Sequence, residues 1–252
     1  MTHKLQQASA LTISNVAWNQ ASYPNPPRSM TDFKVPSELF RSNRLIYRAI
    51  EDTDEDQTFL YSHMNEPAMH LLSGPLLPRP RTRQNAVGFL GSEERLLAIM
   101  ICLPPPSTEP EPTNPQRAPT EKPETSPTPI GHLTLTSKYG SINAHHRHAE
   151  MGLSITTPQQ GKGFGREAIT WAIDWAFRYA NLHRVGIEVF AFNEAALGLY
   201  TSVRFLVEGR AREAVWVAGG WRDVISLGVL EREWLILRGS GEALDVSRVE
   251  SC

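Results

Sequence analysis

The chain has 252 residues, which is enough to bury the core of one domain of ordinary size. A formal charge of −2, with 40% apolar and 21% charged residues, excludes the basic balance typical of nucleic-acid-binding proteins, so we expect neither nucleic acid nor a membrane as partner. No apolar run reaches the roughly 18–20 residues of a bilayer span, and Asn15, Asn19 and Gln20 interrupt any signal-peptide core. Because the only cysteines are Cys102 and Cys252, we expect no structural disulfide and a cytoplasmic protein, with the nucleus as the alternative.

Three stretches are expected to be poorly ordered, and they delimit a single domain of residues 41–238. Residues 1–40 are polar without a clear period, and residues 239–252 form a small polar tail that we expect to be flexible. Residues 104–129 contain ten of the chain's 19 prolines. Because proline lacks an amide proton and fixes φ, this stretch is predicted to be an extended, solvated loop that neither joins a sheet nor continues a helix.

The proline-rich stretch interrupts one sheet and does not link two domains. A strand-like run at Leu96–Ile101 precedes it, and another at Ile130–Leu135 follows it. A linker at this place would leave about 65 residues on its N-terminal side, which is a marginal core. We therefore predict an insertion within a single domain.

The elements expected before the insertion are a strand and a helix. Arg44–Ala49 alternates between apolar and polar residues as a strand does, and a helix is predicted to start in the acidic run Glu51 to Asp56 and to extend to about Met64. The acidic run is expected to be a solvated helix start, since carboxylates are favoured at that end of the helix dipole.

The elements expected after the insertion alternate between strands and helices. In chain order they are the strand Ile130–Leu135, the strand His148–Ile155, an amphipathic helix over 163–180, the strand Val185–Phe190, the helix Glu194–Ser202, the strand Phe205–Arg210 and a hairpin within Val215–Gly228 that turns at Gly219-Gly220. The resulting order, β-α-β-β-β-α-β-α-β-β, indicates an α/β fold in which helices cover a mixed sheet.

A glycine-rich turn lies between the strand His148–Ile155 and the long helix. Gly161, Gly163 and Gly165 would let backbone amides approach a ligand without obstruction by Cβ atoms, and Lys162 and Arg166 add positive charge. The unpaired N–H groups and the dipole of a helix start suit an anionic diphosphate. The spacing fits neither a nucleoside-triphosphate loop nor the dinucleotide fingerprint. A glycine-rich turn without function is the alternative.

A second motif gives the turn its interpretation. Asn193 to Tyr200 reads Asn-x-x-Ala-x-x-x-Tyr, and Asn193 stands 30 residues after Gly163 of the pattern Gln160-x-x-Gly163-x-Gly165. Together the two motifs resemble the GNAT N-acetyltransferase superfamily, over about residues 43–234. The chain looks most like the branch of ribosomal-protein N-terminal acetyltransferases, on the segments Asn43–Arg48, Ala149–Leu153 and Glu208–Arg210. One departure is Arg204, where the family usually has glycine before the phenylalanine.

The resemblance implies a fold and a coenzyme site. The fold would be a single GNAT-like domain with a mixed, mostly antiparallel sheet of six to seven strands, splayed at the central strand. Backbone groups of Leu153 and Ile155 would bind the pantetheine arm, and the side chain of Asn193 would assist. The implied coenzyme-binding residues are Leu153, Ser154, Ile155, Gln160, Gly161, Lys162, Gly163, Phe164, Gly165, Arg166 and Asn193.

Two residues are candidates for acid–base catalysis, and each has a simpler interpretation. An attacking amine must be neutral, and Glu150 on the central strand is the candidate base, directly or through a water. Glu150 would otherwise orient the substrate or pair with a cation. By resemblance Tyr200 would protonate the departing thiolate, and otherwise it is an aromatic packing residue.

The sequence therefore predicts an enzyme, an acetyl-CoA-dependent N-acetyltransferase. The acetyl group would pass to a primary amine, on a protein N-terminus or on a small molecule, by direct attack in a ternary complex. The alternatives are a non-catalytic acyl-CoA-binding module and an adaptor that binds partners through residues 104–129. The acceptor, the acyl-chain preference and the oligomeric state stay open.

The remaining conspicuous residues are expected to be structural. His145, His146 and His148 are expected to lie in a solvated loop, not at a metal, because no cysteine or carboxylate stands at a ligand spacing. We expect no metal cofactor. Trp171 and Trp175, four residues apart, are predicted to belong to the core.

Overall fold

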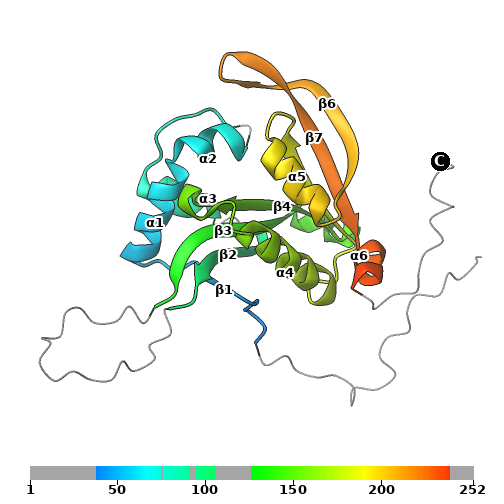
Figure 1. Ribbon diagram of the computed structural model, residues 1–252, viewed down its shortest axis with the longest axis horizontal. Helices are drawn as coiled ribbons and strands as arrows, with labels where there is room; N and C mark the ends of the chain where they lie inside the picture. The colour runs from blue at the N-terminus through cyan, green and yellow to red at the C-terminus, as the bar shows by residue number, and fades with distance from the viewer. Residues whose placement is uncertain (1–37, 75, 91–94, 106–125, 239–252) are drawn as a thin grey trace, which may run out of the picture. The chain divides into compact units, whose positions relative to one another are not determined.

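The computed structural model describes residues 38–74, 76–90, 95–105 and 126–238. A seven-stranded mixed sheet forms its centre, in the spatial order β1-β2-β3-β4-β5-β7-β6 (Figure 1). The strands are β1 (Ile46–Ala49), β2 (Arg95–Leu103), β3 (Thr128–Ser137), β4 (His148–Ile155), β5 (Arg184–Phe190), β6 (Leu206–Val217) and β7 (Gly220–Leu230). The helices are α1 (Asp54–Met64), α2 (Pro67–Leu72), α3 (Arg83–Leu90), α4 (Phe164–Arg178), α5 (Glu194–Ser202) and α6 (Glu231–Leu237).

Helices pack on both faces of the sheet, as the strand β2 shows. Successive side chains of a strand point to opposite faces. Ile99 and Ile101 belong to the large apolar cluster that includes the buried side of α4, whereas Met100 and Cys102 pack with Leu60 of α1 in a second cluster. The predicted α/β architecture with a mixed sheet is therefore confirmed. None of the described helices combines the length and apolarity that a bilayer crossing requires.

The sheet splays at its one parallel strand pair. β4 and β5 are paired only through three residue pairs, from His148↔Arg184 to Glu150↔Gly186. By contrast, β4 pairs with β3 along seven residue pairs and β5 pairs with β7 along seven. The two strands therefore diverge over Met151–Ile155 and Ile187–Phe190, which confirms the expected splay at the central strand.

The helix α4 follows directly from its sequence pattern. Its buried residues recur at three- and four-residue spacing, and those from Ala168 to Phe177 are at most 5% exposed. Trp171 stacks on Tyr47 with 4.0 Å between ring centroids and donates its Nε1–H to the carbonyl of Leu39. Trp171 and Trp175 pack against the main core, as expected.

Three helices escaped the sequence analysis because their segments carry little periodic pattern. α2 has six residues, α3 has eight, and α6 follows β7 without a turn residue between them. The Glu233 carboxylate receives the backbone N–H of Leu230 at 2.9 Å and so caps the start of α6. Short helices are stabilised mainly by their tertiary contacts, which a local pattern does not reveal.

The sheet also extends further than predicted at two places. β6 is one continuous strand to Val217, with a register shift between Ala211 and Val215 where the sequence suggested an interruption. Pro129 pairs with Cys102 at the start of β3, although residues 104–129 were expected to stay outside the sheet. The pairing of β3 with β4 begins only at Gly131. Pro129 therefore lies outside that ladder, and its missing amide proton removes no hydrogen bond to β4.

The acidic run that leads into the first turn of α1 is not wholly solvated, which corrects the expectation for Asp56. Its side chain is 2% exposed and binds the guanidinium of Arg48, with Nη2 to Oδ1 at 2.5 Å. Asp56 also accepts the backbone N–H of Glu51 at 2.9 Å. Burial alone would raise the pKa of Asp56, but the bonds from Arg48 and Glu51 hold that pKa below its usual value.

The unusual residue at position 204 adopts the conformation that glycine would favour. Arg204 has φ of 73°, in the left-handed region. Its backbone N–H bonds to the carbonyl of Thr201 at 3.0 Å and ends α5. A non-glycine residue in this region costs about 1–2 kcal/mol, so the departure from the family pattern is a local strain.

The expectations of disorder for residues 1–40, for the insertion and for the tail fall largely outside the described residues, except that the described domain already begins at Glu38. Within the domain, the backbone N–H of Tyr47 bonds to the carbonyl of Phe40.

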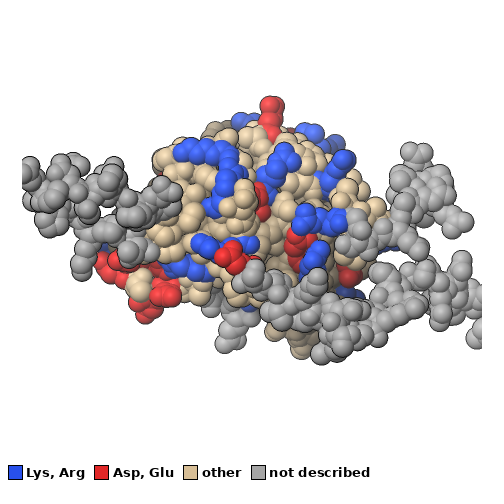
Figure 2. Space-filling view, turned by 60° about the horizontal axis from the view of Figure 1, so that its bottom comes forward, with Lys and Arg blue, Asp and Glu red and all other residues tan. Residues whose placement is uncertain are grey.

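On the face shown in Figure 2, acidic and basic side chains are interspersed. Among the described residues, several charged side chains form ion pairs, as do Arg210 and Asp223 at 2.6 Å.

Candidate functional site

A cleft of about 870 Å³ opens where β4 and β5 diverge. Met151–Ile155 and Ile187–Phe190 line it together with the start of α4, the helices α2 and α5, and the β6–β7 hairpin. Figure 1 shows α2 and the hairpin on opposite sides of α5. The volume is in the range of about 300–1,000 Å³ that small-molecule sites occupy.

The glycine-rich turn forms one end of this cleft. Gly161 and Gly163 both have positive φ, 74° and 83°, and Gly163 is the N-cap of α4. A Cβ atom at Gly165 would come within 3.1 Å of Leu199 on α5, so glycine also lets the two helices approach. The turn therefore brings the start of α4, with its unpaired amides, to the cleft wall.

Most residues that the sequence nominated for the coenzyme do meet at the cleft. Those that line it are Leu153, Ser154, Ile155, Gln160, Gly161, Gly163, Phe164, Gly165, Arg166 and Asn193. Lys162 is not among the lining residues; its ammonium instead donates to the side-chain oxygen of Gln159 at 2.9 Å. These positions fit a diphosphate at the start of α4 and an amide-rich arm along β4.

The helix α5 brings Asn193 and Tyr200 to the same cleft. The Oδ1 atom of Asn193 caps α5 by accepting the backbone N–H of Ala196 at 3.2 Å, so its NH₂ group is the part that this cap leaves for a ligand. Tyr200 lies two turns further along and is 8% exposed. Burial raises the pKa of Tyr200 to about 12, so its hydroxyl keeps its proton at neutral pH.

Glu150, the nominated base, does not line the cleft. Its Oε1 atom lies 3.0 Å from the Lys138 ammonium and 3.3 Å from Nε2 of His148. Burial and the nearby cations, first Arg184, lower the pKa of His148 to about 4, so that ring is neutral at neutral pH. Glu150 lies where β4 still pairs with β5, opposite Gly186. A Cβ atom at Gly186 would come within 2.5 Å of the Glu150 Oε1 atom.

Glu188 is a carboxylate of the cleft wall that the sequence analysis missed. It lies on β5 beyond the three residues that pair with β4, and its side chain is 57% exposed. Lys138 links it to Glu150, with 3.9 Å between Nζ and the Glu188 Oε1 atom. Its position in the middle of a largely apolar strand, Arg-Val-Gly-Ile-Glu-Val-Phe, was the available signal, because a charged side chain inside such a strand needs a solvated or functional place.

The other side of the cleft was also missed, since it comes from α2 and the end of α1. His63 and Glu66 line the cleft there, with 3.1 Å between Nδ1 of His63 and Oε1 of Glu66. Oε2 of Glu66 accepts the Thr157 hydroxyl at 2.9 Å, which ties α2 to the end of β4. Ser154 on β4 donates its hydroxyl to the sulfur of Met69 on α2.

The histidine-rich segment before β4 gives no sign of a metal site. Residues Ser141–His146 form a 3-10 helix, and His148 belongs to β4. Among the described residues, no group of three His, Cys, Asp or Glu side chains is placed to hold a metal ion. Cys102 is a free, fully buried thiol, and burial raises its pKa to about 11.

A sheet that splays at one parallel strand pair, beside a glycine-rich helix start, is the arrangement that the resemblance to acetyltransferases implied. Residues 108–205 match the model of the acetyltransferase (GNAT) family. The matched segment, which spans fewer than half of the chain's residues, is thus similar to that family.

Curated relatives to which the chain is similar are named as N-acetyltransferases but differ in acceptor. Spermidine N(1)-acetyltransferase of Vibrio cholerae is 36% identical over 94 residues, which are 37% of this chain and 54% of that protein. The [ribosomal protein uS5]-alanine N-acetyltransferase of Escherichia coli is 31% identical over 84 residues, or 33% of this chain and 43% of that protein. The chain thus matches about half the length of these relatives.

Among solved structures, the fold is similar to that of the Vibrio cholerae spermidine N-acetyltransferase in complex with CoA and spermine. The TM-score is 0.60 at 23% identity, over 77% of this chain and 99% of that one. The likeness confirms the fold.

Proposed function

We propose that this chain is an N-acetyltransferase that uses acetyl-CoA as co-substrate and acetylates a primary amine. The observation that carries the proposal is that the cleft unites the divergence of β4 and β5, the glycine-rich start of α4 and the buried hydroxyl of Tyr200. Each of these answers a need of the reaction: amides for the pantetheine arm, an anion site for the diphosphate, and an acid for the thiolate.

Binding of the co-substrate would use mainly backbone groups. The unpaired amides of β4 beyond Glu150 would receive the pantetheine arm, and one of them would polarise the thioester carbonyl. The first amides of α4 and the guanidinium of Arg166 would hold the diphosphate. Lys162, which lies outside the cleft wall, would contribute only long-range charge.

The chain's own acid and base would act on opposite partners of the transfer. As the amine nitrogen bonds to the carbonyl carbon and the carbon–sulfur bond breaks, Tyr200 would give its proton to the leaving sulfur. Glu188, directly or through a water, would take the proton that the amine loses, because it lines the cleft and Glu150 does not. Glu150 would then orient Lys138, whose pKa rises through its bond to Glu150 although burial opposes the rise.

The acceptor would enter between α2 and the β6–β7 hairpin. That part of the wall is formed by small and apolar residues, among them Ala68, Leu72, Ala214 and Val215. The acceptor amine could belong to a protein N-terminus or to a small molecule such as a polyamine, the two kinds of acceptor in the relatives' names. The free thiol of Cys102 agrees with a reducing compartment, and we propose the cytoplasm.

The test is acetyl transfer itself. The purified protein is incubated with acetyl-CoA and a panel of peptides and amines; thiol release is followed and products are identified by mass spectrometry. We expect an acetylated amine and one thiol per acetyl group transferred. Tight CoA binding without any acetylated product would instead support a non-catalytic acyl-CoA-binding module.

A further inference from the structure

Arg44, which precedes β1, reaches the outer side of the glycine-rich turn. Its Nη1 atom donates to the carbonyl of Lys162 at 3.0 Å, and its Nε atom donates to Glu167 Oε2 at 2.8 Å. The guanidinium carbon lies 4.7 Å from the centre of the Phe164 ring. A single side chain from residue 44 therefore touches the turn, the first residue of α4 and the first turn of that helix.

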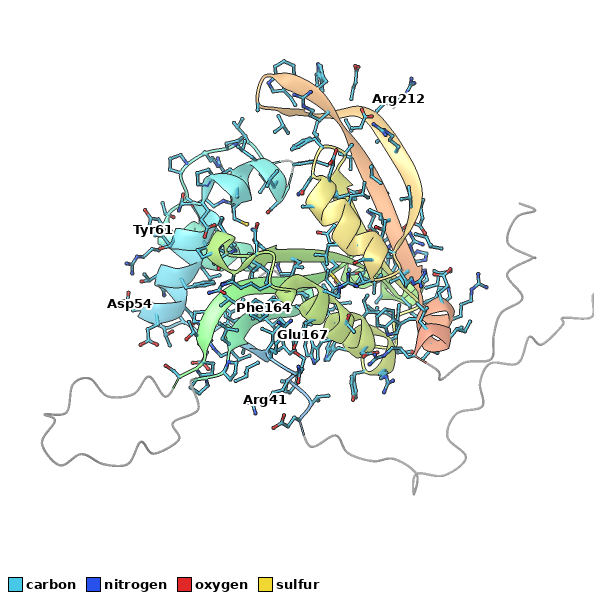
Figure 3. All side chains as sticks on the ribbon, in the orientation of Figure 1. Arg41, Asp54, Tyr61, Phe164, Glu167 and Arg212 are labelled. Atoms are coloured by element: carbon cyan, nitrogen blue, oxygen red, sulfur yellow. The ribbon has the colours of Figure 1, made fainter. Side chains whose placement is uncertain are left out.

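Glu167 completes this contact from the helix side. Its Oε1 atom accepts the backbone N–H of Arg44 and the hydroxyl of Ser42, both at 2.7 Å. Figure 3 labels Glu167 and Phe164 at the start of α4, above the segment that carries Arg41. The Glu167 side chain is 14% exposed and its bond to Ser42 is partly buried, whereas the Arg44 side chain is 45% exposed.

The network continues into the core and so has a rigid base. The Ser42 hydroxyl lies 2.8 Å from the hydroxyl of Tyr47, a residue that is 2% exposed. Tyr47 in turn stacks on Trp171 of α4. Arg44 and Glu167 are thus held by groups whose positions the folded core determines.

The contact fixes the orientation of one peptide group in the turn. A peptide unit is planar, and none of the described peptides is cis, so the carbonyl of Lys162 and the N–H of Gly163 point in opposite directions. Since Arg44 binds that carbonyl, the N–H of Gly163 points away from Arg44. Gly163 lines the cleft, and a Cβ atom there would come within 3.2 Å of Arg44 Nη2, so Arg44 also packs against the turn.

Charge explains why Arg44 needs Glu167. A guanidinium beside the start of a helix meets the positive end of the dipole, which is unfavourable by itself. Glu167, in the first turn of α4, offsets both that dipole and the Arg44 charge. The pair leaves Arg166 as the cation that lines the cleft on this turn.

We propose that Arg44 and Glu167 are positioning residues for coenzyme binding, which hold the glycine-rich turn so that its amides face the diphosphate. The inference rests on the proposed function for the identity of the ligand. It assigns to the segment before β1, some 120 residues away in sequence from the turn, a role in affinity for the nucleotide part of the co-substrate and none in the transfer step.

The first measurement is CoA binding by titration calorimetry with the full chain. Arg44→Met should raise the Kd for CoA about tenfold, which is the affinity that one charge-assisted hydrogen bond provides. Arg44→Lys keeps the charge but not the two-pronged contact, and should raise the Kd by a smaller factor. Arg83→Met is the matched control, because Arg83 makes an exposed ion pair with Asp54 at 2.7 Å on α1 and does not line the cleft.

A second measurement separates positioning from general stability. Acetyl-pantetheine lacks the nucleotide diphosphate, so Arg44→Met should lower kcat/KM for acetyl-CoA but leave kcat/KM for acetyl-pantetheine unchanged. An equal loss with both donors, or an unchanged Kd for CoA, would overturn the inference. If Arg44→Met does not fold, as judged by its circular dichroism, Arg44→Lys takes its place in both measurements.

The two proposals fail in different ways. A wild-type chain that binds CoA but acetylates no amine would refute catalysis, while the comparison of Kd values would still decide the role of Arg44. Normal transfer together with an unchanged Kd in Arg44→Met would refute the positioning role alone. A wild-type chain that binds no CoA would overturn both.

Discussion

The two ends of the cleft are built in different ways. The coenzyme end comes from one nearly continuous stretch, residues 153–166, and from the short helix α5. The proposed acceptor end is assembled from α2 and the β6–β7 hairpin, which are more than 130 residues apart in sequence. Backbone amides that serve a ligand demand glycines and helix starts at fixed places, whereas a wall of small apolar side chains demands only a shape. The first kind of site leaves a motif in the sequence, and the second does not.

The sharpest test of the coenzyme end is Tyr200→Phe. Removal of the acid should lower kcat by about 100- to 1,000-fold, with the KM for acetyl-CoA unchanged, measured by thiol release. Because burial raises the pKa of Tyr200 to about 12, kcat of the wild type should also not decline between about pH 8 and pH 10 through loss of this proton. Equal product from both proteins would remove Tyr200 as the acid and leave it a packing residue.

The next largest effect is expected for Glu188→Gln, which keeps the shape and removes the base. We expect kcat to fall about 100-fold, with a smaller loss for an acceptor amine of lower pKa. Glu150→Gln is the matched control on the neighbouring strand and should cost only a few-fold, since Glu150 does not line the cleft. The reverse order of the two losses would return the catalytic role to Glu150.

Gly163→Glu tests whether the turn is the diphosphate site. The substitution forces a side chain into a position with φ of 83° and directs it at Arg44, whose Nη2 atom would lie 3.2 Å from the new Cβ atom, so the turn should shift and the KM for acetyl-CoA should rise about 30-fold. Gly198→Glu, in the middle of α5 where a Cβ atom meets nothing within 4 Å, serves as the control and should bind normally. An unchanged affinity of the Gly163 variant would disconnect the turn from the coenzyme.

At the acceptor end, Val215→Lys should act on the amine alone. A cation on the hairpin would repel a protonated amine by about 1 kcal/mol, which corresponds to a roughly fivefold higher acceptor KM. Initial rates at varied acceptor and varied acetyl-CoA measure the two KM values separately. A change in the KM for acetyl-CoA would show that the two ends are not independent.

The smallest effect is expected at Arg204, whose left-handed backbone conformation would favour glycine. Arg204→Gly should raise the free energy of unfolding by about 0.5–1 kcal/mol, because relief of the left-handed strain exceeds the entropy that glycine adds to the unfolded chain. Denaturant titration measures it. Arg204→Ala would still need the same conformation and should give no gain.

What the sequence predicted follows the same division. The strand His148–Ile155 and the helix Glu194–Ser202 were predicted with the bounds that the structure has, because apolar spacing and the Asn193 cap are local signals. The placement of ten coenzyme-binding candidates at the cleft followed from two motifs on those elements. Asp56 was misjudged because its partner, Arg48, comes from an element whose neighbours only the sheet register reveals. The catalytic role of Glu150 stays a prediction, and its contact with Lys138 is the cation pair given as its simpler interpretation.

The α2 wall lay beyond prediction on physical grounds. Its six residues offer fewer than two helical turns of pattern, and what places it is the tie from Glu66 to Thr157 and from Met69 to Ser154. Those partners are about 90 residues away along the chain. No local rule connects them.

The short register between β4 and β5 has a consequence for the mechanics of the domain. Three residue pairs join the strands β1–β4 to the strands β5–β7 in the described chain. Because so few residue pairs connect them, we expect the two groups of strands to separate from each other in a partial opening of the domain. Amide exchange should therefore be faster at Met151–Ile155 than in the middle of β3, and a ligand that adds its own amides to the gap would slow it, acting as the strand that the protein lacks.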